Sequence, residues 1–206
     1  MKHGSTKRLI LCALFCALIA IGAQITIPVP YGAFTLQLLF VLLAGFLLPA
    51  RDGFLTMLAY LLLGLVGAPV YAGFSGGLSS LVSPTFGFVL GMAAACPAVS
   101  WLFRRLRGRV RPFPAAVLSG LAGIAVTYLF GAVYGYFVMT LVLNQAVSPW
   151  FVVWTFCLMY LPFDAAKLLF AAVASSALAR RLPRCAAQRQ PGARCRSAAR
   201  PRSLSL

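Results

Sequence analysis

The chain has 206 residues, of which 62% are hydrophobic and only 10% are charged, and its mean hydropathy is +0.93. A soluble domain of this length does not need so much apolar surface, so the composition argues against a soluble fold and favours one integral membrane domain. The net charge of +16 would suit a nucleic-acid-binding protein, but the positions of the charges along the chain argue against that class.

Six hydrophobic runs follow one another, at residues 9–27, 36–50, 53–72, 85–103, 113–143 and 151–180. A membrane-spanning helix needs about 20 apolar residues. The pattern therefore predicts an all-α integral membrane protein with six transmembrane helices, contained in residues 1–182. Because a proline suits the first turn of a helix and disrupts its interior, Pro162 predicts that the last helix begins near Leu161, after a separate lead-in segment at 146–160.

The basic residues fall in alternate connectors between the runs. Seventeen of the eighteen Lys and Arg residues, all except Lys167, lie in residues 1–8, at position 51, in 104–111 or in 180–202, whereas the connectors 28–35, 73–84 and 144–149 carry no charge. With six spans, all seventeen lie on one side, and the positive-inside rule predicts that both termini are cytoplasmic. A nucleic-acid-binding protein would not show this alternation.

The last segment, residues 183–206, is rich in arginine and lacks apolar periodicity. We predict a disordered cytoplasmic tail. Its expected partner is anionic membrane lipid, which attracts each nearby basic residue by about 1 kcal/mol.

Asp164 and Lys167 lie inside the last apolar run, and Asp52 is the only other acidic residue of the chain. Residues three apart share one helix face, and a charge at the centre of a membrane helix costs about 2.5–3.5 kcal/mol on insertion scales. A structural salt bridge is one interpretation, but a functional site is the default for such a pair. One acceptor and one donor would suit a neutral ligand with adjacent N–H and C=O groups, or a zwitterion.

Two uncharged connectors, 27–37 and 67–88, are rich in glycine, serine, threonine and proline. Such residues let backbone approach a ligand closely and supply hydrogen bonds without charge. They indicate either a ligand pocket with a lid near the outer face or ordinary tight loops. Aromatic residues of the fifth run, Tyr128 among them, either stack on a flat ligand ring or simply pack in the bundle.

Several motifs are absent from the sequence. No Gly-Lys pair occurs, so the chain has no phosphate-binding loop for ATP hydrolysis. The only histidine is His3, and the six cysteines show no Cys-x-x-Cys spacing. We therefore expect no enzyme activity, no cofactor, no metal site and no disulfide framework. In the first run, Ala13 and Ala17 have the small-xxx-small spacing that lets membrane helices approach closely.

Three stretches resemble the BioY family, the biotin-specific substrate-binding (S) components of energy-coupling factor (ECF) transporters. They are IPVPYGAFTLQLLFVLLAGFLL (27–48), LAYLLLGLVGAPVYAGFSGGLSSLVSPTFGF (58–88) and LPFDAAKLLFAA (161–172), and they occur in the order of the family motifs. The sequence departs from the family at Phe86 and Phe163, where a glycine is common.

The resemblance implies a six-helix bundle in the bacterial cytoplasmic membrane that captures biotin at its outer side for uptake. It also implies a transmembrane coupling (T) subunit and paired ATP-binding-cassette ATPases as partners, with Ala13 and Ala17 at the partner interface. Asp164 and Lys167 match the family's ligand-contacting pair. The candidate ligand-binding residues are Asp164, Lys167, Thr35, Gln37, Tyr71, Ser83 and Thr85.

We expect Asp164 to accept a ureido N–H of biotin and Lys167 to donate to the ureido C=O. A competing assignment places Lys167 on the valerate carboxylate. Two alternatives to biotin uptake stay open: an S component for another small vitamin, and a stand-alone structural or signalling membrane protein with a buried Asp-Lys pair.

Overall fold

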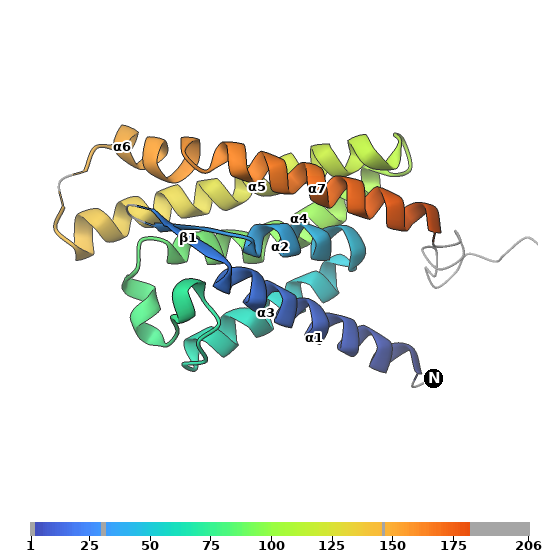
Figure 1. Cartoon of the computed structure of the whole chain (residues 1–206), viewed down its shortest axis with the longest axis horizontal. Coiled ribbons are helices and arrows are strands. Elements are labelled where there is room, and N and C mark those ends of the chain that lie inside the picture. Colours follow the sequence, from blue (N-terminus) through green and yellow to red (C-terminus); the bar gives the residue numbers. More distant parts are fainter. Residues whose placement is uncertain (1–2, 30–31, 146, 182–206) are drawn as a thin grey trace, which may run out of the picture.

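The computed structural model describes residues 3–29, 32–145 and 147–181. Figure 1 shows helices that run roughly along one long axis, with a small hairpin and short helical turns at one end. The predicted tail, 183–206, lies outside the described residues. The elements are α1 (His3–Gln24), β1 (Thr26–Val29), β2 (Gly32–Thr35), α2 (Gln37–Leu47), α3 (Ala50–Leu65), the 3₁₀ helices η1 (Ala72–Phe74) and η2 (Leu78–Val82), α4 (Phe86–Leu106), α5 (Pro112–Phe137), the π-helix η3 (Val138–Val142), α6 (Pro149–Val153), the π-helix η4 (Trp154–Leu158) and α7 (Leu161–Arg181).

Four helical stretches of the described residues are long and apolar enough to cross a membrane. They are Thr6–Gln24, Phe86–Leu106, Pro112–Val142 and Pro149–Leu178, and they correspond to the first, fourth, fifth and sixth predicted runs. The chain is therefore a multi-pass membrane protein. α2 has only 11 residues, which is about 16 Å at 1.5 Å per residue, so it is much shorter than a typical spanning helix.

The third apolar run, 53–72, extends beyond the helix that it contains, and its last residues belong to the glycine-rich connector 67–88. α3 ends at Leu65, and the chain turns at Gly67, which has a φ of 110°. Glycine adopts this left-handed region without steric cost, so the helix stops here although the apolar sequence continues. Residues 66–85 instead form a loop with η1 and η2.

The sixth run is divided as predicted. α6 and η4 form the lead-in segment, and α7 starts at Leu161 with Pro162 in its first turn. The missing N–H of a proline costs nothing there, because the first N–H groups of a helix have no partner within it.

A two-stranded antiparallel hairpin follows α1, with Thr26 opposite Thr35 and Pro28 opposite Ala33. The prediction of an all-α protein missed this hairpin. Its β-branched residues Thr26, Ile27 and Val29 favour extended backbone, but they lie where the apolar run 9–27 meets the connector 27–37, whose prolines and glycine indicated a loop.

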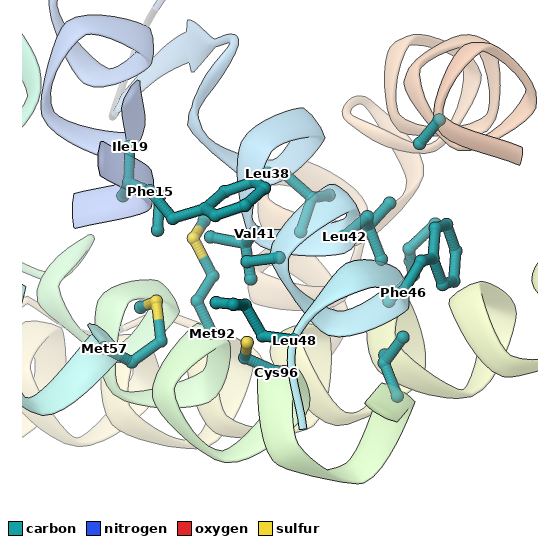
Figure 2. Close-up of a cluster of buried hydrophobic side chains, with 14 of the residues drawn as sticks. Phe15, Ile19, Leu38, Val41, Leu42, Phe46, Leu48, Met57, Met92 and Cys96 are labelled. Carbon is teal, nitrogen blue, oxygen red and sulfur yellow. The ribbon is translucent and has the colours of Figure 1, made fainter. Parts of the chain in front are cut away.

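The main core lies where α1, α2, α3 and α4 meet. Figure 2 shows Phe15 of α1 beside Val41 of α2, with Met57 of α3 and Met92 of α4 nearby. α2 is central, because Val41 and Leu42 are each 1% exposed. Ser100 of α4 binds the end of α2, because its hydroxyl donates a hydrogen bond of 2.7 Å to the carbonyl oxygen of Leu48.

α4 and α5 pack closely along their length. A Cβ on Gly91 would lie 2.8 Å from the backbone of Thr127, and a Cβ on Gly131 would lie 2.6 Å from the ring of Phe88. Small residues let two membrane helices approach until their backbones touch. This close pair positions Tyr128 and Phe88, which both line the cavity described below.

The two ends of the bundle differ in chemistry. Figure 1 places the start of α1, the α2–α3 turn, the α4–α5 turn and the end of α7 at one end, which we call the basic end. The hairpin, η1, η2 and the α5–α6 connection lie at the other, the hairpin end. At the basic end Arg8 of α1 donates two hydrogen bonds, of 2.8 and 2.6 Å, to the carboxylate of Asp52 in the first turn of α3.

Candidate functional site

A buried ion pair lies at the start of α7. Asp164 is in the first turn of the helix and Lys167 is one turn later. Their side chains are 7% and 11% exposed, and Lys167 Nζ lies 2.7 Å from Asp164 Oδ1. The shared face predicted from their spacing is confirmed. The partial positive charge at a helix N-terminus also favours the Asp164 carboxylate.

Tyr128 of α5 is a third member of this cluster. Its hydroxyl donates a hydrogen bond of 2.7 Å to Asp164 Oδ2, so each carboxylate oxygen has one donor. From the sequence, Tyr128 was only a candidate for stacking or packing. The hydrogen bond depends on α5 lying against α7, and the distance of 36 residues along the chain gives no signal of it.

The cluster lines a cavity of about 350 Å³ at the hairpin end. This volume lies within the range typical of small-molecule sites, about 300–1,000 Å³. The structure brings all seven predicted ligand-binding residues to its wall: Thr35, Gln37, Tyr71, Ser83, Thr85, Asp164 and Lys167. Lining residues that the sequence did not single out as ligand contacts include Thr26, Ser75, Ser80, Phe88, Met92, Thr127 and Tyr160.

Two of the predicted residues use their polar groups within the protein. Gln37 Nε2 donates to the hydroxyl of Tyr60 at 3.1 Å, and Tyr60 donates to Val70 O at 2.9 Å. Tyr71 Oη donates to Leu61 O at 2.7 Å. Burial raises the pKa of the Tyr71 hydroxyl, which keeps it protonated. These bonds attach the loop after α3 to α2 and α3, so Tyr71 offers mainly its ring to the cavity.

The loop before α4 supplies small hydroxyl groups. The side chains of Ser83 and Thr85 are hydrogen-bonded to each other at 2.8 Å. Ser80 Oγ is buried and has no hydrogen-bond partner among the described residues. A buried hydroxyl without a partner is costly, so a ligand that reaches Ser80 would relieve that cost.

Aromatic side chains form one wall of the cavity. The rings of Phe88 and Tyr160 are stacked, with centroids 6.1 Å apart and an interplanar angle of 28°, and Tyr128 meets Phe88 edge-on at 6.3 Å. Phe86 is buried between Tyr71 and Tyr134, with ring centroids 5.8 and 6.0 Å away. This packing explains how the fold accommodates a phenylalanine where the family motif commonly has glycine.

The hairpin covers the cavity and is attached to the start of α7. Thr26, Pro28, Ala33 and Thr35 line the cavity from this side. Phe34 of β2 packs against Tyr160 at 4.6 Å and against Phe163 at 4.4 Å between ring centroids. Phe163, the second departure from the family motif, thus contacts the hairpin.

The predicted partner residues Ala13 and Ala17 lie on the exposed side of α1. Leu14 and Ile21 on the same helix are 52% and 55% exposed, so this face is apolar and uncovered in the single chain. Within residues 3–29, 32–145 and 147–181, no three His, Cys, Asp or Glu side chains are grouped to hold a metal ion.

A multi-pass bundle whose cavity combines a buried ion pair, uncharged hydroxyl groups and an aromatic wall defines a membrane protein that binds a small solute. The comparisons with known proteins agree. The model of the BioY family matches residues 1–184, so the chain belongs to the BioY family. This is a family of transporters rather than enzymes.

Three relatives illustrate the similarity. The chain is 36% identical over 174 residues to the biotin transporter BioY of Thermotoga maritima, covering 81% of this chain and 92% of the relative. It is 36% identical over 148 residues to a probable biotin transporter BioY of Lysinibacillus sphaericus (72% of this chain, 74% of the relative). It is 42% identical over 125 residues to a probable biotin transporter BioY of Pyrococcus horikoshii (61% and 72%).

The fold has a counterpart among solved structures. A 2.1 Å crystal structure of the S-component for biotin from an ECF-type ABC transporter matches with a TM-score of 0.77 at 23% identity, covering 89% of this chain and 95% of that one. At this level of identity the match establishes the fold.

Proposed function

We propose that this protein captures biotin and mediates its uptake as the S component of an ECF-type ABC transporter. The observation that carries the proposal is the cavity lined by Asp164, Lys167 and Tyr128 in a chain of the BioY family. The relatives it resembles are biotin transporters, and the cavity offers the groups that this ligand requires.

The ureido ring of biotin presents two N–H donors and one C=O acceptor on a rigid edge. A carboxylate only accepts and an ammonium only donates. In our assignment Asp164 accepts a ureido N–H and Lys167 donates to the ureido oxygen, while the stacked rings of Phe88 and Tyr160 contact the apolar body of the ligand. In the competing assignment Lys167 pairs with the valerate carboxylate.

Binding of biotin and of biotin amide to the detergent-purified protein tests the proposed ligand and the assignment of Lys167. Charge-assisted hydrogen bonds contribute about 1.5–3 kcal/mol, so Asp164→Asn should lower biotin affinity about tenfold to a hundredfold. The amide should bind the parent protein nearly as well as biotin if Lys167 contacts the ureido ring. If the amide loses as much affinity as biotin loses on Lys167→Met, and that mutant does not discriminate the two ligands, our assignment of Lys167 is wrong.

The same measurement separates the alternatives. An S component for another small vitamin would release labelled biotin to an excess of that vitamin, and a purely structural or signalling protein would bind neither. Saturable biotin binding that other vitamins do not displace is the expected result.

The proposed topology has six spans with both termini in the cytoplasm of a bacterial inner membrane. Its support is the basic end, which gathers the N-terminus, both Arg-containing turns and the end of α7 (Figure 1), as the positive-inside rule requires. Labelling of single cysteines at Ser79 and Gly108 in a cysteine-free background tests it. From outside, the Ser79 site should react and the Gly108 site should not; equal labelling would contradict the topology.

We further propose a division into a biotin-binding membrane domain, residues 1–182, and a basic tail, residues 183–206. A T subunit and paired ATPases would supply the energy, because the sequence has no phosphate-binding Gly-Lys motif. Biotin-dependent ATP hydrolysis should therefore require the added subunits. Hydrolysis by the pure chain alone would refute this proposal.

A further inference from the structure

Five arginines are concentrated in the connection between α4 and α5. Arg104 and Arg105 lie in the last turn of α4, and Arg107, Arg109 and Arg111 follow before Pro112 opens α5. All five side chains are exposed. The connection is a short, hydrogen-bonded turn, with Arg107 N bonded to Phe103 O at 2.9 Å and Arg109 N bonded to Leu106 O at 2.8 Å. We call residues 104–111 the arginine turn.

The chain's own carboxylate side chains do not neutralise the arginine turn. The sequence contains only Asp52 and Asp164. Asp164 lies at the hairpin end and is paired with Lys167, and Asp52 is paired with Arg8. Arg104 interacts electrostatically with Asp52. The other four arginines of the turn have no carboxylate side chain assigned to them. The tail, residues 183–206, contains no Asp or Glu, so it has no side-chain carboxylate to offer to these arginines.

Large apolar side chains are interleaved with these arginines. Trp101 is 55% exposed, Val110 is 41% exposed and Phe113 is 42% exposed. The guanidinium of Arg105 lies over the Trp101 ring, 4.7 Å from its centroid. Tryptophan is enriched at the level of lipid headgroups, and arginine reaches from apolar surroundings to the polar interface. A turn that carries both kinds of side chain is typical of the membrane–water boundary.

We propose that the arginine turn binds the phosphate headgroups of anionic phospholipids. Guanidinium groups bind phosphate through paired hydrogen bonds, and the exposed tryptophan and phenylalanine lie beside the acyl chains. The position of the turn favours lipid over a protein partner. Figure 1 shows it on the opposite side of the bundle from α1, and under our proposed function α1 carries the partner interface.

The three tryptophans allow a local measurement. Trp101 lies beside the arginine turn, whereas Trp150 and Trp154 lie at the hairpin end, in a stretch from Pro112 to Phe163 that has no charged residue. Full-length Trp150→Phe/Trp154→Phe keeps only Trp101, and Trp101→Phe/Trp154→Phe keeps only Trp150. Each is reconstituted in mixed phosphatidylglycerol and phosphatidylcholine vesicles in which either lipid is brominated, and quenching reports which lipid contacts the tryptophan.

The ratio of phosphatidylglycerol contacts to phosphatidylcholine contacts should be about five at Trp101. This selection corresponds to about 1 kcal/mol, the contribution of one basic residue near an anionic surface. Trp150 should show a ratio near one. Substituting Arg107, Arg109 and Arg111 with glutamine should bring the Trp101 ratio to about one, and substituting them with lysine should retain most of the selection. The lysine variant also shows whether a loss reflects charge or misfolding.

A charge-matched control substitutes three arginines of the tail with glutamine: Arg184, Arg189 and Arg194. It should leave the Trp101 ratio unchanged. A ratio that falls in the tail variant and not in the turn variant would overturn the proposal, as would equal selection at Trp101 and Trp150. A ratio of one at Trp101 in the parent protein would assign the arginines to another anion, such as an acidic protein surface, and would also overturn it.

Discussion

The hydroxyl of Tyr128 on α5 lies 2.7 Å from Asp164 Oδ2 on α7, while Lys167 Nζ lies 2.7 Å from Oδ1 of the same carboxylate. The two donors hold the carboxylate from both sides in a low-dielectric site, where an unpaired charge would be very costly. The site is thus organised before a ligand arrives, and the carboxylate retains lone pairs for a ligand N–H.

Tyr128→Phe removes one of these donors and keeps the ring. We expect biotin affinity to fall severalfold to about tenfold. A hydrogen bond to a charged group contributes about 1.5–3 kcal/mol, but the bond is also present in the unliganded protein, so only part of this energy affects binding. The measurement is a biotin titration of the purified variant. Tyr136→Phe on the same helix is the control, because Tyr136 does not line the cavity; equal losses in the two variants would exclude a specific role for Tyr128.

Asp164 and Lys167 should also depend on each other for stability. Asp164→Asn leaves Lys167 buried without an anion, and breaking a buried pair in this way costs about 3–5 kcal/mol. The double variant Asp164→Asn/Lys167→Met has no unpaired charge and should recover part of this loss. Thermal unfolding in detergent without ligand measures both variants. A double variant that is no more stable than Asp164→Asn would show that the ammonium is already compensated by solvent.

The sequence predicted the site better than it predicted the elements around it. Asp164 and Lys167 stood out because charges are rare in apolar runs, and the small polar residues of two connectors stood out by composition. Each signal is local in the chain, and the structure brings these residues to one cavity.

What the sequence did not reveal depends on contacts between distant elements. The Tyr128–Asp164 bond spans 36 residues, and the Phe34–Phe163 contact joins the hairpin to α7. Hydropathy showed that the second run, 36–50, is shorter than a typical span, but it did not show that α2 itself has only 11 residues.

Phe163 should hold the hairpin over the cavity. Its ring lies 4.4 Å from that of Phe34, and aromatic pairs contribute about 0.5–1.5 kcal/mol beyond their burial. Phe163→Ala should therefore speed the dissociation of bound biotin about two- to tenfold, measured by chase of labelled ligand. Phe170→Ala, on the same helix with a side chain 64% exposed, is the matched control and should leave the rate unchanged. A slower dissociation from Phe163→Ala would show that the phenylalanine obstructs the hairpin instead.

The exposed face of α1 gives the last prediction. Ala13 and Ala17 are one helical turn apart on an apolar, uncovered surface, where small side chains let a second helix approach closely. Ala13→Trp and Ala17→Trp should each prevent co-purification of the coupling subunit while biotin binding is retained, because neither residue lines the cavity. Ala125→Trp, at an exposed alanine of α5, controls for the bulk of the indole and should leave assembly intact. If Ala17→Trp abolished biotin binding but not assembly, α1 would have to be assigned to the ligand site; if all three variants lost assembly, the effect would reflect insertion of a large ring and not a partner face.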